Sequence, residues 1–317
     1  MYDDIEPLLS DAGLPLGQPF TAAQSRARGI TPDVLRRMCR EGLVRRVFRG
    51  VYVDAAADDT LASRAQALAL VVPPTAIVTD ECAAWALGVD LLARGDHLIP
   101  PPLSIHQPLE RTRVRQPRTA GGRRTLTARD IELVNGIRVT SGLRTACDLA
   151  RLRAQPRGLA ALDALQRRQR FSAEQLAAEI PRFAGHRGVV RLRELAPLAD
   201  PHAESPAESS MRLLWLDAGL PSVTTQIPVL DDWGNEIYRL DMGIPEIRYA
   251  AEYDGVAWHS SPEQKNHDRR RRTWLREHRG WDIDVLGSEE VFLRPQRAPE
   301  IFRSGIARAE WRRAHAA

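Results

Sequence analysis

The pattern of apolar and basic residues is clearest near the start of the chain. Residues 44–53, Val-Arg-Arg-Val-Phe-Arg-Gly-Val-Tyr-Val, alternate around Gly50, which predicts two short strands joined by a turn. A helix before them is expected to begin at Thr31, as the N-cap, with Pro32 in its first turn. Its apolar face is expected to contain Val34, Leu35, Met38 and Leu43. With a shorter helix at residues 21–29, the pattern predicts a winged helix.

The last third of the chain changes between helical and strand periods. A helix is expected to run from Ser205, as its N-cap, to Gly219. Period-two alternation then predicts three strands and, after a second helix, a fourth strand. The strands are expected at residues 223–230, 237–243, 248–254 and 281–286, with the helix at residues 262–278. The order α-β-β-β-α-β predicts a sheet flanked by helices.

The middle of the chain is less regular. Helices are expected at residues 65–72 and 79–88, from residue 140, and from Ser172, which forms a capping box with Gln175. Short strands are expected between them, and the proline-rich residues 196–206 are expected to form a linker. We therefore predict a mixed α/β, multidomain protein with domains at residues 1–55, 56–200 and 201–317.

Charge is distributed unevenly along the 317 residues. The net charge is only +4, yet residues 21–50 carry eight arginines against two acidic residues, and residues 201–317 carry 16 basic and 19 acidic residues. Neither a membrane-spanning window nor an apolar signal segment is visible, and the three cysteines have no paired spacing. We expect a cytoplasmic protein with reduced thiols and no membrane association.

The arginines of the predicted winged helix suggest contact with double-stranded DNA. Three are expected on its second helix and three on its wing: Arg36, Arg37, Arg40, Arg45, Arg46 and Arg49. The alternative is a solvated basic face on a winged helix that binds protein. A second arginine-rich stretch, residues 111–124, is consistent with contact to a phosphate backbone, and equally with a solvated hairpin.

The first part of the chain resembles a known family. Residues 15–54, above all Gly42-Leu-Val-Arg-Arg-Val-Phe-Arg-Gly-Val-Tyr-Val, resemble the N-terminal domain of AbiEi antitoxins of type IV toxin–antitoxin systems. The mixed α/β segment after it resembles the middle region of AbiEi-like antitoxins. The resemblance implies DNA binding, a role in phage defence or toxin–antitoxin biology, and a cognate toxin or a second copy as protein partner.

Three carboxylates interrupt the apolar strands of the last domain. Asp241 lies in the second strand, Glu252 and Asp254 lie in the third, and His259 follows. Charged side chains in apolar strands are costly unless something binds them. If the two strands are neighbours in suitable register, Asp241 and Glu252 converge. Carboxylate oxygens are ligands that Mg²⁺ prefers, so a site for Mg²⁺ or Mn²⁺ is expected here.

The same residues resemble the PD-(D/E)xK nucleases, with the DUF559 domain and the very-short-patch repair endonucleases nearest. The resemblance is carried by Glu208, Asp241, Glu252-Tyr-Asp-Gly, His259, Asp268, Arg269 to Arg272 and Gly280-Trp281. It implies that Asp241 and Glu252 hold the metal, that Asp254 and Glu208 support it, and that His259 moves a proton. Arg269 and Arg272 are then expected to contact phosphate.

One position departs from that family pattern. Asp254 stands where most members of the superfamily have the catalytic lysine. A purely structural role is the alternative for two of the acids, since Glu208 fits a capping box and Asp241 can pair with Arg239 or Arg248. The principal hypothesis is a DNA-binding, metal-dependent endonuclease. The alternatives are a non-cleaving AbiEi-type antitoxin and repressor that uses the nuclease fold as a scaffold, and a nicking enzyme for mismatched duplexes.

Overall fold

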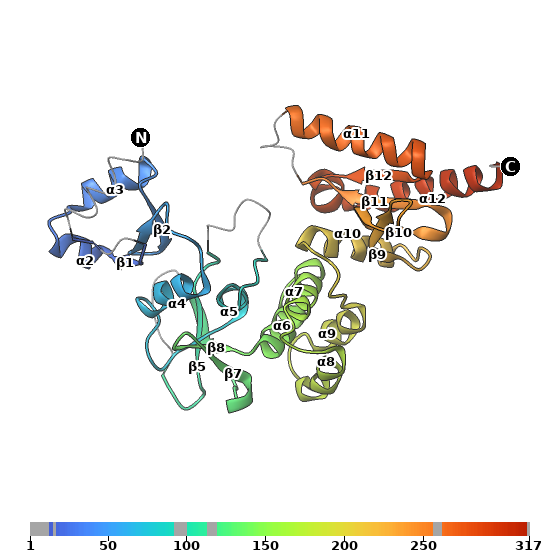
Figure 1. Cartoon of the computed structure of the whole chain (residues 1–317). Helices are drawn as coiled ribbons and strands as arrows, with labels where there is room; N and C mark the ends of the chain where they lie inside the picture. The colour runs from blue at the N-terminus through green and yellow to red at the C-terminus, as the bar shows by residue number, and fades with distance from the viewer. Residues whose placement is uncertain (1–12, 15–16, 92–99, 113–118, 256–261, 316–317) are drawn as a thin grey trace. The chain divides into compact units, whose positions relative to one another are not determined.

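In the described part of the chain, the fold consists of three separate β-sheets, each with its own helices (Figure 1). The computed structural model describes residues 13–14, 17–91, 100–112, 119–255 and 262–315, and of residues 262–265 it describes the backbone only. The mixture of helices and strands along the chain confirms the predicted α/β class.

The first sheet has the elements of a winged helix, with strand order β1-β3-β2. In chain order these elements are β1 (Phe20–Thr21), α2 (Ala22–Ala27), α3 (Pro32–Arg40), β2 (Val44–Phe48) and β3 (Val51–Asp54). The Thr31 hydroxyl caps α3 by accepting from the Val34 backbone N–H at 3.3 Å, as predicted. Leu35 and Met38 pack into the core, but Val34 is 46% exposed, so its predicted place on the apolar face is wrong.

The second sheet has five strands in the order β6-β5-β4-β8-β7. Its strands are β4 (Ile77–Val78), β5 (Ser104–Gln107), β6 (Ala120–Arg123), β7 (Ile131–Val134) and β8 (Ile137–Thr140). The helices of this part are α4 (Leu61–Ala69), α5 (Asp80–Ala86) and α6 (Gly142–Leu152). Cys82 and Cys147 are buried thiols here, whereas Cys39 of α3 is partly exposed.

The parallel pairing of β5 with β6 requires glycine at one position. A Cβ at Gly121 would lie 1.9 Å from the carbonyl oxygen of Ile105, whereas a Cβ at Gly122 would meet nothing closer than 3.9 Å. We expect Gly121→Ala to lower the free energy of unfolding by at least about 2 kcal/mol and Gly122→Ala to change it by less than about 0.5 kcal/mol. Urea unfolding of both variants measures this, and equal losses would contradict the pairing.

Three helices follow the second sheet: α7 (Gln155–Arg167), α8 (Ala173–Glu179) and α9 (Val189–Leu195). The capping box predicted for α8 is confirmed, since the Gln175 backbone N–H donates to the Ser172 hydroxyl and the Gln175 side chain accepts from the Ser172 backbone N–H. The segment predicted as a linker is tied down at Asp200, whose backbone N–H donates to Asp163 of α7 at 2.8 Å.

The last sheet has the strand order β12-β11-β10-β9. Its elements are α10 (Pro206–Asp217), β9 (Thr224–Leu230), β10 (Glu236–Ile244), β11 (Tyr249–Tyr253), α11 (Pro262–Arg279), β12 (Asp282–Leu286) and α12 (Ala298–His315). The predicted order α-β-β-β-α-β is confirmed as far as β12. Helix α12 is an addition that the sequence patterns did not include.

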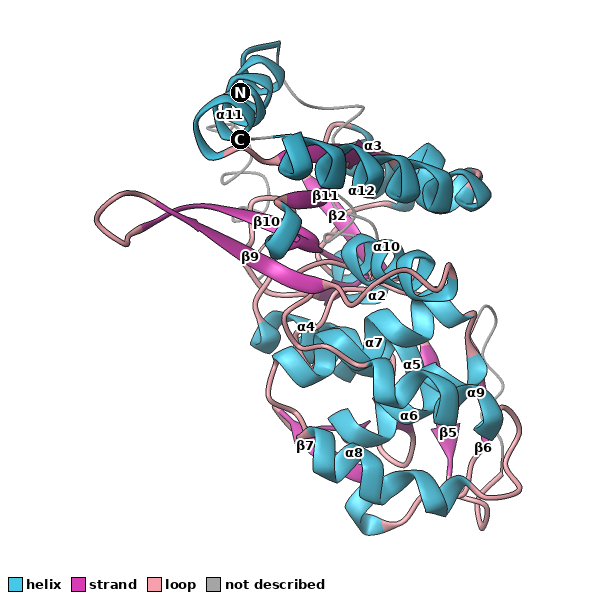
Figure 2. Cartoon of the chain, turned by 90° about the vertical axis from the view of Figure 1, so that its right-hand side faces the viewer, coloured by secondary structure: helices cyan, strands magenta, loops and turns pink. Residues whose placement is uncertain are grey.

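Helices cover both faces of this last sheet. Trp215 of α10 and Phe302 of α12 pack with Tyr249 on one face, whereas Leu275 of α11 packs with Ala250 on the other. Strands β9 and β10 extend past the sheet as a long hairpin (Figure 2). The sheet is therefore buried between helices, and the carboxyl end of β11 lies beside α11.

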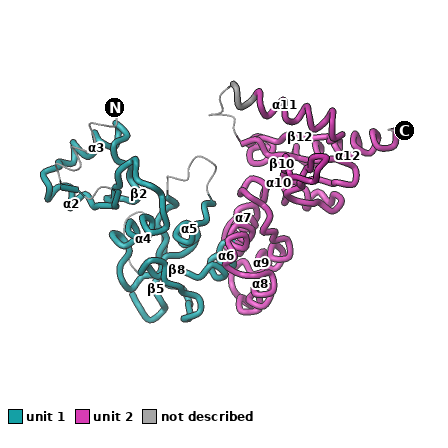
Figure 3. The backbone as a smooth tube through the Cα atoms, in the orientation of Figure 1, with its two compact units in different colours: residues 1–149 teal, residues 150–317 magenta. Residues whose placement is uncertain are grey.

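The chain divides into two compact units, residues 1–149 and residues 150–317 (Figure 3). The first unit contains the winged helix and the five-stranded sheet, and the second contains α7 to α12 with the last sheet. This boundary differs from the domain limits expected at residues 55 and 200, which stay a prediction.

Candidate functional site

Arginines of α3 and β2 surround one surface pocket. The pocket has a volume of ≈ 540 Å³ and is lined by Asp33, Arg36, Cys39, Arg40, Arg46 and Tyr52. Arg36 and Arg40 lie one turn apart on α3, and Arg46 reaches the pocket from the neighbouring strand. A concave surface with three guanidinium groups and one carboxylate is suited to an anion such as a phosphate.

The predicted DNA-binding arginines differ in how available they are. Arg36 pairs with Asp33, and the Arg37 Nε donates to Glu41 at 2.7 Å, so a neighbouring acid partly offsets each charge. Arg40, Arg46 and Arg49 are exposed and form no ion pair within the described residues. Of the six arginines predicted to bind DNA, these three therefore carry charge that no described acid offsets.

Arg45 lies apart from that group. It is only partly exposed, and burial lowers the pKa of its guanidinium despite the attraction of Asp59. Neighbouring residues of a strand face opposite ways, so Arg45 and Arg46 leave β2 on different sides. Arg45 therefore belongs to the inner side of the wing, which the alternating sequence alone did not distinguish.

The structure brings the carboxylates of the last domain close together. Strand β10 pairs antiparallel with β11, and Met242 lies opposite Ala251. One residue further along the pair, Asp241 of β10 therefore lies beside Glu252 of β11. The Tyr253 backbone N–H donates to the Asp241 Oδ2 at 2.7 Å. Arg239 and Arg248, the predicted alternative partners of Asp241, instead contact Glu204 and the Arg279 carbonyl.

The charge on Asp241 is disfavoured by its surroundings. Burial raises the pKa of Asp241, and the carboxylates of Glu208 and Glu252 raise it further, to about 7, against the opposing hydrogen bond from Tyr253. Burial also raises the pKa of Glu252. Three carboxylates therefore share one electrostatic environment, which a bound cation would stabilise.

Glu208 also has the structural role that its sequence position allowed. The Ser205 hydroxyl donates to Glu208 Oε1 at 2.7 Å, and the Glu204 backbone N–H donates to Oε2 at 2.8 Å. The Gln226 side chain adds a third hydrogen bond at 2.8 Å. Glu208 is thus held at the start of α10 while its charge acts on Asp241.

Two arginines of α11 pair with Glu252 of β11 and with Asp254, which directly follows that strand. The Arg271 Nη2 lies 2.9 Å from Glu252 Oε1 and 2.8 Å from Oε2, and the Arg272 Nη2 lies 3.3 Å from Asp254 Oδ2. Arg269, which was expected beside the site, contacts Asn266 on the exposed side of the helix. The sequence analysis included Arg271 in the run Arg269 to Arg272 but did not single it out as a partner of Glu252. Arg271 precedes the fully buried Leu275 by one helical turn and so shares its inward face.

The expected metal site has suitable donors but a competitor. His259 lies outside the described residues, and within the described part of the chain no three His, Cys, Asp or Glu side chains are placed to hold one ion. Asp241 and Glu252 supply the oxygen donors that Mg²⁺ or Mn²⁺ prefers. Glu252, however, would have to share or release Arg271 to bind a cation.

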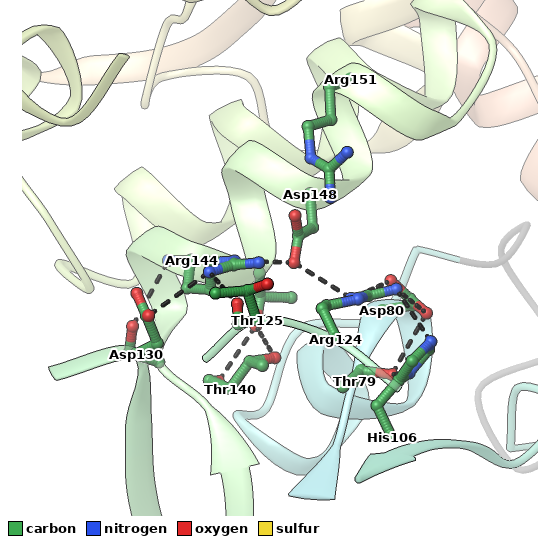
Figure 4. Close-up of polar contacts among 12 residues, drawn as sticks. Thr79, Asp80, His106, Arg124, Thr125, Asp130, Thr140, Arg144, Asp148 and Arg151 are labelled. Carbon is green, nitrogen blue, oxygen red and sulfur yellow. Dashed lines mark hydrogen bonds and ion pairs between the residues drawn. The ribbon is translucent and has the colours of Figure 1, made fainter. Parts of the chain in front are cut away.

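A second polar cluster lies in the five-stranded sheet, where the sequence showed no constellation (Figure 4). Arg124 contacts Asp80 Oδ1 and Asp148 Oδ2, each at 3.0 Å. Arg144, on α6, contacts Asp148 at 2.8 Å and Asp130 at 3.3 Å. Asp80 also accepts from the Ser104 hydroxyl at 2.8 Å. Arg124, whose side chain is 11% exposed, is therefore a structural cation, and neither the phosphate contact nor the solvated hairpin that its arginine-rich segment left open describes it.

Because of this cluster, we expect the free energy of unfolding to depend on pH in the acidic range. Burial alone would raise the pKa of Asp80, but Arg124 and the Ser104 hydroxyl lower it from 3.8 to about 2. The resulting stabilisation, about 2 kcal/mol, is present above pH 4 and is lost as the pH falls towards 2. We expect the difference in unfolding free energy between the wild type and Asp80→Asn to shrink over that range. A difference that stays constant from pH 5 to pH 2 would contradict the ion pair.

Two of these regions match models of known protein families. Residues 16–53 match the family model described as "Transcriptional regulator, AbiEi antitoxin", and residues 75–198 match the "AbiEi antitoxin C-terminal domain". The chain thus contains AbiEi antitoxin domains in both ranges, which confirms that part of the resemblance.

Two curated relatives extend the comparison. They are uncharacterized proteins from two strains of Mycobacterium tuberculosis, each 37% identical to this chain over 167 residues. The match covers 53% of this chain and 61% of each relative, so the chain spans less than two thirds of their length. Among the described helices of this chain, none has the length and apolar content needed to cross a bilayer.

Proposed function

We propose that this protein is a DNA-binding transcriptional regulator of the AbiEi antitoxin type. The observation that carries the proposal is the pocket between α3 and β2, where Arg36, Arg40 and Arg46 gather around one concave surface. The match of residues 16–53 to a transcriptional regulator supports it.

The mode of binding follows from the winged helix. In this motif the second helix enters the major groove while the wing lies along the backbone. Arg40 then reaches the groove or its phosphate edge from α3, and Arg46 and Arg49 contact phosphates from the wing. Because phosphate contacts give affinity without sequence information, specificity must come from other exposed residues of α3.

A binding titration tests this function. Fluorescence anisotropy of the full chain with the duplex that lies directly upstream of its own coding sequence is expected to show a submicromolar Kd at about 150 mM salt. An unrelated duplex of equal length is expected to bind at least about 1,000-fold more weakly. Equal, weak binding to both duplexes would contradict a role as a specific regulator.

The antitoxin domains also support a protein partner. The family description of residues 75–198 is that of an antitoxin, so we propose a cognate toxin as partner of this region, with a second copy of the chain as the alternative. Copurification with the product of the adjacent gene tests the first, and analytical ultracentrifugation of the isolated chain tests the second.

A second candidate function concerns the last sheet. We propose that Asp241 and Glu252 hold Mg²⁺ or Mn²⁺ for phosphodiester hydrolysis, with Asp254 and Glu208 in support and His259 as the proton-transfer group. What favours it is that Asp241 lies next to Glu252 in the paired strands and that the carboxylates of Glu208 and Glu252 both act on Asp241. When bound, the ion would activate water and neutralise charge on the phosphate.

Plasmid nicking separates this candidate from a non-cleaving scaffold. We expect supercoiled DNA to be nicked with Mn²⁺ by the wild type, and not by Asp241→Asn or Glu252→Gln. Nicking that persists in both variants, or that is absent from the wild type while DNA binding is intact, would reject the nuclease and leave the regulator.

A further inference from the structure

Arg271 has the features of a counter-ion that the protein itself provides for the carboxylate of Glu252. Glu252 is only 5% exposed, and a single nitrogen of Arg271 lies within 2.9 Å of both its carboxylate oxygens. A buried carboxylate is costly without a cation, so this contact is needed for the strand to keep its charge.

Arg271 is held in place by the fold around it. It projects from the side of α11 that packs on the sheet, and its guanidinium lies 5.8 Å from the ring centroid of Tyr238. Its side chain is 20% exposed, and its Nε is buried without a hydrogen-bond partner in the described structure. The group therefore sits between α11 and β11 with one donor unused.

The neighbouring charges show what this cation does. The carboxylates of Glu208 and Glu252 both act on Asp241, and Arg272, which contacts Asp254, also acts on Glu252. Strand β11 contains no basic residue. Asp254, directly after it, stands where most of the nucleases that this segment resembles have a lysine. The positive charge of the cluster thus comes from α11.

We propose that Arg271 is the resident cation of this carboxylate cluster and takes the electrostatic place of a divalent metal ion while it is paired with Glu252. A divalent ion then binds the wild type weakly, because it must approach a guanidinium and compete for the same oxygens. The nuclease candidate would therefore need excess Mn²⁺ to displace Arg271 from Glu252. The proposal concerns the last sheet alone and does not depend on DNA binding by the winged helix, which every variant below should retain.

Thermal unfolding of the full chain tests the proposal, with EDTA or with MnCl₂ or MgCl₂ alone. We expect Arg271→Gln to lower the Tm in EDTA by several degrees, because the buried carboxylate of Glu252 loses its arginine partner. Mn²⁺ should restore at least half of that loss and bind this variant at least about tenfold more tightly than the wild type by calorimetry. Arg271→Lys should keep most of the wild-type Tm, and Arg270→Gln, on the exposed neighbour, should match the wild type.

A double variant keeps the test decisive if Arg271→Gln folds poorly. Arg271→Gln with Glu252→Gln removes both charges, so it should regain Tm in EDTA and lose the response to Mn²⁺. Three results would each overturn the proposal: equal Mn²⁺ stabilisation of the wild type and Arg271→Gln, no Tm loss in Arg271→Gln, or a double variant no more stable than the single one. Since all of these are read from stability and ion binding, they leave the regulatory function to its own titration.

Discussion

Replacing Arg124 with alanine is expected to destabilise the first unit by about 3–5 kcal/mol. Arg124 contacts both Asp80 and Asp148, which are 4% and 0% exposed. Its removal takes the arginine partner from Asp80 and leaves Asp148 with Arg144 as a remaining arginine partner, and an unpaired buried charge costs far more than a lost surface contact. Since folded domains are stable by only about 5–15 kcal/mol, a large share of the total would be lost.

The next residue along the chain is the matched control. Arg123 is exposed and, among the described residues, donates only to the Leu109 carbonyl, at 3.2 Å, so Arg123→Ala should change the unfolding free energy by less than about 0.5 kcal/mol. Urea unfolding followed by circular dichroism gives both values. Similar small losses in the two variants would show that the cluster does not carry the stability assigned to it.

Removing Arg40 and Arg46 together is expected to weaken DNA binding by about 100-fold, or roughly 1.5 kcal/mol for each arginine. Both are exposed at one pocket and have no ion-pair partner in the described part of the chain. Each phosphate contact releases counter-ions, so the slope of log affinity against log salt should become shallower by about 2. Anisotropy titrations between 50 and 300 mM salt measure both effects.

Arg45 supplies the control within the same strand. Because it lies on the inner side of the wing near Asp59, Arg45→Ala should leave the salt slope unchanged. A variant of Arg40 and Arg46 that keeps the wild-type slope, or an Arg45→Ala variant that loses as much, would contradict the assignment of the binding face.

Local signals in the sequence were enough for many of the elements. Thr31, Ser172 and Ser205 each predicted a helix start, and each caps its helix in the structure. Strand period also anticipated that β10 and β11 would bring Asp241 and Glu252 to one place, given that the strands pair. These features depend on residues a few positions apart, or on one strand pairing that the hairpin order suggests.

The remaining features depend on contacts between distant segments. Arg124 and Asp80 are separated by 44 residues, and Arg271 and Glu252 by 19, so no local pattern identifies either pair. An arginine-rich run reads as a solvated or phosphate-binding surface whether or not one member turns inward. Helix α12 was missed, although Phe302, Ile306 and Ala309 follow a helical period against the sheet.

The most direct test of the regulatory function is hydrogen–deuterium exchange of the full chain with and without its upstream duplex. The winged-helix interface predicts that DNA protects amides of residues 32–49, which span α3 and β2, more strongly than any other segment. Protection concentrated in residues 206–286 instead, with no change in residues 32–49, would contradict that interface. It would assign the DNA-binding surface to the domain of the last sheet.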